Sequence, residues 1–182
     1  TALHICAIGF SATGSPVFTN PSMFPQLPLL ALFKGRTQPA EFQHVSLIAV
    51  QHLLRETGCL LDAGRQLGIP AESILAIGKP YSSNRNVTRQ IKQSGIEAQI
   101  PDAKWKSGHY GPFFRLAIGR LLAAETSPLR LKTTEIGIIL DDGGYCMELM
   151  QRRTNGKSRL VGIEQTTSGL KMILANPLRF PV

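Results

Sequence analysis

The chain has 182 residues, of which 43% are hydrophobic and 18% are charged, and its mean hydropathy is +0.02. This balance is enough for the packed core of one domain, or a domain and a half, and carries too little charge for an intrinsically disordered protein. The net charge of +8 favours anionic partners. However, the basic residues are scattered and form no stripe with interleaved aromatics, which argues against a nucleic-acid-binding surface.

Residues 1–40 contain many prolines and show no clear period, so we expect an irregular segment that packs on the domain, with a strand at 3–10 and a short helix at 27–33. From residue 41 apolar runs alternate with helical periodicity, and Gly68 and Gly95 close two of the helices. The expected strands are 44–50, 72–79, 96–100, 135–142 and 159–165; the expected helices are 53–68, 84–95, 111–125, 144–153 and 167–174.

This alternation predicts an α/β fold: a Rossmann-like, three-layer domain with a mostly parallel sheet. The three cysteines are far apart and form no CxxC, and no His–Cys spacing indicates zinc. We therefore expect reduced thiols, no metal site and a cytoplasmic location. No run reaches the roughly 18 apolar residues that a membrane span needs, and the start lacks the basic segment of a signal peptide.

Parallel sheets bind ligands at the carboxyl ends of their strands, where this chain places polar groups after several strands. His52 follows the first strand of the regular part, and Asp142 ends the strand at 135–142. The carboxylates of Asp141 and Asp142 are adjacent and repel each other, and a helix N-terminus or a bound partner would reduce this repulsion. The alternative is an ordinary strand-to-helix turn with Asp142 as its N-cap, in which Gly143 and Gly144 supply positive φ.

Two further strand ends carry hydroxyl groups. The stretch "GKPYSS" places Tyr81 and Ser82 on a loop whose path Pro80 fixes. The stretch "EQTTSG" follows a strand and opens a helix, so its hydroxyls either face a ligand or cap the helix. Neither of these two stretches decides a function by itself. The same holds for His52, because a single histidine is more often structural than catalytic.

The order "ILDDGG", a short helix, then a strand leading into "EQTTSG" resembles the adenosylhomocysteinase family. The stretch "VQHLLRETG" is similar to that family's strand that ends in a His and leads into a helix containing Glu-Thr. The resemblance implies that residues 41–182 form a substrate-binding domain for an adenosine-type nucleoside. It implies His52 and Asp142 as catalytic groups and Gln165, Thr166, Thr167, Tyr81 and Ser82 as substrate-binding groups.

The family hydrolyses S-adenosylhomocysteine reversibly by a redox cycle on tightly held NAD, so the resemblance implies that activity for a full-length parent. Gln165 and Leu54 depart from the family's Glu and Thr, and the chain contains no G-x-G-x-x-G. We therefore expect no NAD on this chain and no activity from it alone. The alternative is a non-catalytic module that binds a small ligand or assembles with a partner. We expect a monomer or a small homo-oligomer.

Overall fold

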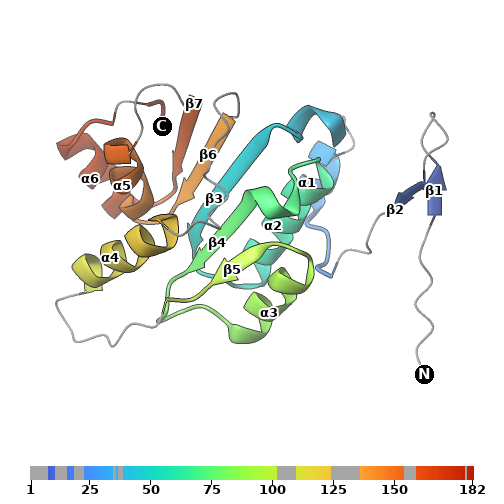
Figure 1. The fold of residues 1–182 in the computed structure, drawn as a ribbon, viewed down its shortest axis with the longest axis horizontal. Helices are drawn as coiled ribbons and strands as arrows, with labels where there is room; N and C mark the ends of the chain where they lie inside the picture. Colours follow the sequence, from blue (N-terminus) through green and yellow to red (C-terminus); the bar gives the residue numbers. More distant parts are fainter. Residues whose placement is uncertain are drawn as a thin grey trace.

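The centre of the molecule is a sheet of five parallel strands (Figure 1). The computed structural model describes residues 8–10, 16–18, 23–34, 36, 39–101, 110–123, 136–153, 159–178 and 180–182. The strands lie in the order β5-β4-β3-β6-β7. Their bounds are β3 Val45–Gln51, β4 Ile74–Gly78, β5 Glu97–Gln99, β6 Ile136–Asp141 and β7 Arg159–Glu164.

The strand order has a switch point between β3 and β6. The chain runs outward from β3 to β4 and β5, then returns to the other side of β3 for β6 and β7. Doubly wound sheets have this arrangement, and their ligands bind outside the carboxyl ends of the strands at the switch point. The fold therefore directs attention to the residues that follow β3 and β6.

Helices cover both faces of the sheet, which makes three layers (Figure 1). The helices α2 (Arg55–Gln66) and α3 (Arg85–Gln93) contribute to one core with Leu47 and Ala49 of β3, and Leu27, just before α1 (Pro28–Lys34), packs against it. The helices α4 (Tyr110–Ala123), α5 (Tyr145–Arg153) and α6 (Thr167–Ala175) contribute to the other core, with Ile48 and Val50. The alternation along β3 follows from the two-residue period of a strand. The predicted Rossmann-like α/β fold is confirmed.

The central strands are buried on both faces. Every residue of β3 and of β4 is buried, as expected for parallel strands between two helical layers. The edge strand β7 instead alternates exposed and buried positions over most of its length. The long apolar runs in the sequence were therefore reliable signals of the inner strands.

The N-terminal part contains a short hairpin and a helix. The hairpin joins β1 (Ile8–Phe10) to β2 (Pro16–Phe18) in an antiparallel pair. The sequence predicts a strand at 3–10, of which residues 3–7 lie outside the described part of the chain. It predicts loops where β2 lies, because a three-residue strand has no measurable period. Helix α1 lies where a helix is expected, and Pro28 occupies its first position. Before it, Phe24 is buried against Gly58 of α2.

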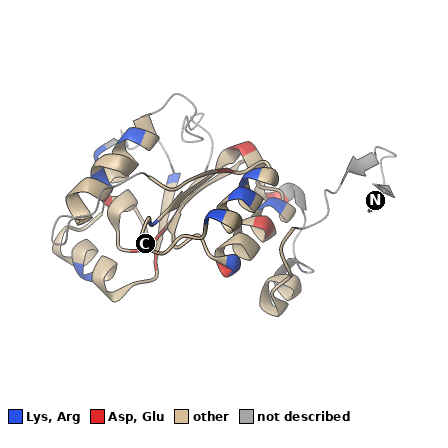
Figure 2. Ribbon diagram, turned by 90° about the horizontal axis from the view of Figure 1, so that it is seen from below, with Lys and Arg blue, Asp and Glu red and all other residues tan. Residues whose placement is uncertain are grey.

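No helix in the described ranges has the length and apolar character required to cross a membrane. Lys and Arg residues lie on helices of both layers in Figure 2, in agreement with the scatter along the sequence. The charge of the described part is therefore spread over the molecule.

Candidate functional site

The site is built at the switch point, where β3 and β6 end side by side. Val50 pairs with Asp141, and the N–H of Asp142 donates to the carbonyl of Val50 at 3.0 Å. His52 is the first residue after β3, and Asp142 is the first after β6. Nε2 of His52 lies 3.1 Å from Oδ2 of Asp142. Two residues predicted as catalytic from separate motifs are thus in direct contact.

Asp142 also pairs with a lysine that follows β4, on the other side of β3. Nζ of Lys79, the first residue after β4, contacts Oδ1 of Asp142. Lys79 is 5% exposed and Asp142 is 6% exposed, so both charges are withdrawn from water. Such a pair persists because each charge would be costly to bury without the other. One buried carboxylate therefore has Lys79 on one oxygen and His52 on the other.

The second ring nitrogen of His52 also has a partner. Nδ1 contacts Oγ of Ser82, and the ring of Tyr81 packs edge-on against the imidazole with centroids 5.6 Å apart. Tyr81 itself is 60% exposed, so one side of the aromatic ring remains open to a ligand. Predicted site residues from the loops after β3, β4 and β6 therefore form one cluster.

Backbone and hydroxyl contacts hold the loop after β4 against the loop after β3. The N–H of Leu53 donates to Oγ of Ser83 at 3.0 Å, and the N–H of Asn84 donates to the carbonyl of Leu53 at 2.9 Å. Gly78 is required beneath this turn, because a Cβ there would lie 2.6 Å from Oγ of Ser83. These contacts fix Ser82 next to His52. The Asn84 side chain then caps helix α3.

The adjacent carboxylates of Asp141 and Asp142 have separate roles. Oδ2 of Asp141 accepts hydrogen bonds from the N–H groups of Cys146 and Met147 at 2.7 and 3.0 Å, so it caps the N-terminus of α5. The capping residue is therefore Asp141, and the alternative that Asp142 is the N-cap is wrong. Burial raises the pKa of Asp141 to about 7, although the two N–H donors act in the opposite direction.

Glu164 joins the two turns that carry the sequence motifs. Its carboxylate accepts hydrogen bonds from the N–H of Gly143 at 3.2 Å and from the N–H of Thr166 at 2.7 Å. Gly143 and Gly144 have φ values of +103° and +71°, as the sequence predicts for this turn. Gly169 leaves room for the carboxylate, because a Cβ there would lie 2.2 Å from Cδ of Glu164.

The hydroxyl-rich turn after β7 is mainly engaged in capping. Oγ1 of Thr166 accepts from the N–H of Gly169 at 3.1 Å, so the capping interpretation holds for Thr166. Thr167 is exposed at the first position of α6. Nε2 of Gln165 donates to Oε1 of Gln51 at 2.8 Å. This bond holds Gln165 at the end of β3, because Gln51 is the residue before His52. The contact of Gln165 with a ribose stays a prediction.

An aromatic group extends the cluster away from His52. The rings of Tyr81 and Tyr110 meet edge-on with centroids 5.1 Å apart, and Tyr110 in turn contacts Phe114 and Tyr145. Burial raises the pKa of the Tyr110 hydroxyl. Tyr110 therefore stays neutral over the physiological pH range, and the charge next to this aromatic group is the Arg115 guanidinium, 5.2 Å from the centroid of the Tyr145 ring.

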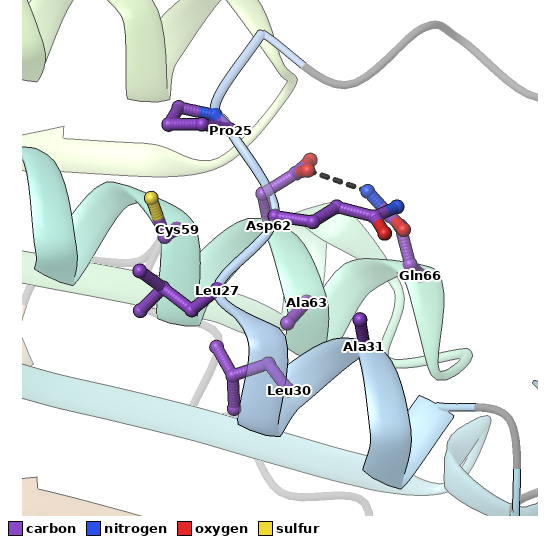
Figure 3. Close-up of a pocket in the computed structure, with 9 residues that line it drawn as sticks. Pro25, Leu27, Leu30, Ala31, Cys59, Asp62, Ala63 and Gln66 are labelled. Atoms are coloured by element: carbon purple, nitrogen blue, oxygen red, sulfur yellow. Dashed lines mark hydrogen bonds between the residues drawn. The ribbon is translucent and has the colours of Figure 1, made fainter.

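A separate hollow lies between α1 and α2, away from the strand ends (Figure 3). It offers about 20 Å³, room for about one water molecule. Two of its polar side chains bond to each other, since Nε2 of Gln66 donates to Oδ2 of Asp62 at 2.6 Å (Figure 3). It is lined by Pro25, Gln26, Leu27, Leu30, Ala31, Cys59, Asp62, Ala63 and Gln66. We interpret it as the packing seam of α1.

Sequence reasoning missed three members of the network. Lys79 is noted only as part of a loop, while Gln51 and Glu164 are assigned no role. A lysine placed directly after a buried apolar strand is the one available signal, because Lys is almost never fully buried unless it is paired. Within the described residues, no group of three or more His, Cys, Asp or Glu side chains is arranged to hold a metal ion.

No protein-family model matches the chain. It is similar to two uncharacterized proteins of Mycobacterium tuberculosis, MT0113 of strain CDC 1551 / Oshkosh and Rv0104 of strain H37Rv, each 29% identical over 161 residues. The match covers 84% of this chain and 30% of each relative, so the chain spans less than a third of their length. Both relatives are uncharacterized, and the resemblance to adenosylhomocysteinases therefore stays a prediction.

Proposed function

We propose that the cluster at the switch point binds an adenosine-type nucleoside, and that a full-length parent hydrolyses S-adenosylhomocysteine reversibly with NAD. The observation that carries this proposal is the contact between His52 and Asp142. The two residues come from separate motifs of the resemblance and lie at the edge where a doubly wound sheet takes its ligand.

The residues of the cluster divide the work of binding and proton transfer. Asp142 is buried against Lys79 and lies beside His52, so its carboxylate holds the imidazole in place. His52 takes up or delivers a proton near a leaving group through the Ser82 hydroxyl, which contacts its other ring nitrogen. Tyr81 offers an exposed aromatic face for the base of the nucleoside. Gln165 replaces a carboxylate of the family with an amide, which still hydrogen-bonds hydroxyls but cannot act as a base.

Among the described residues, the turn after β6 does not offer the free N–H groups that a dinucleotide would need. The turn after β6 opens helix α5, but the N–H groups of Cys146 and Met147 already bind Asp141 rather than being free for a pyrophosphate. The chain also has no glycine-rich G-x-G-x-x-G loop. NAD, which would supply oxidation of the ribose in the family's chemistry, is therefore assigned to another part of the parent.

Titration calorimetry with adenosine tests the binding step. We expect saturable binding to the wild-type chain and weaker binding to His52→Gln, which removes the imidazole that contacts Asp142. Gln66→Ala, in the α1–α2 hollow, is the matched control and should bind like the wild type. Absence of saturable heat with adenosine and with S-adenosylhomocysteine would contradict the proposal.

A second candidate is a non-catalytic module that binds a small ligand or a partner. The observation that favours it is Lys79, which occupies one oxygen of Asp142. The amide of Gln165 favours it as well, since it is bonded to Gln51. Turnover of S-adenosylhomocysteine by a full-length parent in the presence of NAD separates the two: product formation supports the hydrolase, and binding without turnover supports the module.

A further inference from the structure

We propose that Ser82 is a nucleophile activated by His52, and that this cluster hydrolyses small acyl esters. The proposal does not require a nucleoside to bind. It rests on three groups in a row: the Ser82 hydroxyl contacts one nitrogen of the His52 ring, and the Asp142 carboxylate contacts the other. A hydroxyl, an imidazole and a carboxylate connected in this order are the parts of a base-activated serine.

The contacts define which nitrogen of His52 carries the proton. The Asp142 carboxylate lies 3.1 Å from Nε2 of His52 and favours the tautomer with the proton on that nitrogen, because an ionised carboxylate offers no proton of its own. Lys79 contacts the same carboxylate and offsets its charge. In the neutral imidazole Nδ1 is then an acceptor, and the hydroxyl of Ser82 donates to it. The lone pair that takes a proton therefore faces Ser82.

This arrangement also decides which group meets a substrate. Both nitrogens of His52 are occupied by protein groups, so the ring reaches a bound molecule only through Ser82 or Asp142. Asp142 is 6% exposed and held by Lys79, whereas Ser82 is only half-buried. Ser82 is therefore the group of this row that a substrate can approach.

Ser82 stands where the chain passes from a strand to a helix. It lies between the end of β4 at Gly78 and the start of α3 at Arg85. The neighbouring Ser83 is committed to structure, because its Oγ accepts from the N–H of Leu53. This contact fixes the turn, so the direction of Ser82 toward His52 does not depend on a bound ligand. The geometry is therefore preorganised.

The reaction is balanced within the cluster and water. Oγ of Ser82 attacks the carbonyl carbon of an ester and its proton passes to Nδ1 of His52, while the proton on Nε2 stays beside the Asp142 carboxylate. The bond to the leaving alcohol breaks, and the alcohol takes the proton from Nδ1. Water then attacks the acyl group and gives a proton to Nδ1. Release of the carboxylic acid returns that proton to Ser82.

A fluorophosphonate probe tests the proposal on the whole chain. We expect one phosphonyl group per chain by intact mass, located on Ser82 by peptide fragmentation, and hydrolysis of p-nitrophenyl acetate. Ser82→Ala should lose the adduct, and His52→Gln should label slower by about 10²–10⁴-fold, the usual contribution of a general base. Ser168→Ala, at an exposed serine, should label like the wild type.

An unmodified wild-type chain after prolonged exposure to the probe, or an adduct on a residue other than Ser82, rules out an activated serine here. Because fragmentation locates the adduct in the wild-type chain, the answer does not depend on whether Ser82→Ala folds. Adenosine titration of the same wild-type preparation tests the nucleoside proposal separately, so failure of one does not imply failure of the other.

Discussion

The ammonium group of Lys79 contacts the carboxylate of Asp142 across 63 residues of sequence, and both side chains are buried. The pair connects the end of β4 to the end of β6 over the end of β3, which lies between them in the sheet. His52 completes this bridge from β3. The contact therefore joins the carboxyl ends of three neighbouring strands at the place where the sheet takes a ligand.

Lys79→Met should destabilise the chain by about 3–5 kcal/mol, because it leaves the Asp142 charge buried without its lysine. Urea unfolding measures this free energy. The double variant Lys79→Met with Asp142→Asn should lose less free energy of unfolding than the two single variants lose together, because the two residues are coupled.

The matched control for this pair is Arg152→Met. Arg152 pairs with Glu148 at 3.2 Å, but its side chain is 73% exposed. An exposed pair of this kind contributes about 0.2–1 kcal/mol. Equal losses for Lys79→Met and Arg152→Met would contradict the assignment of Lys79 to a buried ion pair.

We expect the free energy of unfolding to change with pH because Asp141 titrates. Burial raises the pKa of Asp141 in the folded state to about 7, above its ordinary value of 3.8. The carboxyl group of Asp141 therefore binds its proton more tightly in the folded state than in the unfolded state. The stabilisation from Asp141 is fully present below about pH 4 and is lost as the pH rises through 7. In that window it falls by at most about 1.4 kcal/mol per pH unit.

Asp141→Asn isolates this contribution. The amide oxygen still accepts from Cys146 and Met147 but does not titrate, so the stability of the variant should fall less between pH 4 and pH 7 than that of the wild type. Urea unfolding at several pH values measures both. Parallel curves for the two proteins would show that Asp141 is not the titrating group.

Gly169→Ala should weaken the contacts that join the turn after β6 to the turn after β7. The added Cβ would overlap the carboxyl group of Glu164, which holds Gly143 and Thr166. We expect a lower melting temperature. Gly119→Ala is the matched control in α4, where a Cβ would meet no heavy atom within 4 Å. It should raise stability by about 0.4–1 kcal/mol, so a loss in both variants would contradict the local explanation.

Gln165→Glu should raise the affinity for adenosine if the ribose lies at this position, because a carboxylate accepts hydroxyl hydrogen bonds more strongly than an amide. The substitution also removes the donor to Oε1 of Gln51, so the amide of Gln51 must rotate to face the new carboxylate. Calorimetry with Gln165→Ala as control measures the effect. An unchanged titration curve for Gln165→Glu would count against this placement of the ribose.

The sequence predicted the architecture well because its signals are local. Apolar runs marked β3 and β4, and helical periodicity marked α2 and α3. Placement of His52 and Asp142 at one edge followed from the rule that parallel strands share their carboxyl side. The three-residue strand β2 was missed, because so short a strand has no period to detect.

The network around Asp142 was less predictable because it depends on which side chains face one another. The contact of Lys79 with Asp142 has no periodic signature. The different roles of Asp141 and Asp142 could have been predicted from the sequence, because successive residues of a strand point to opposite faces. Thr166 shows the reverse case: its hydroxyl fits both a ligand and a cap, and only the structure assigns it to the cap.

The ring nitrogens of His52 provide the most direct test of the nucleoside site. Their ¹⁵N resonances can be followed by NMR during a titration with adenosine, with the exposed His44 as an internal control. We expect the His52 resonances to shift saturably, in step with the calorimetric binding curve, while those of His44 stay in place. Resonances of His52 that do not move, or that move only as much as those of His44, would contradict a nucleoside site at this switch point.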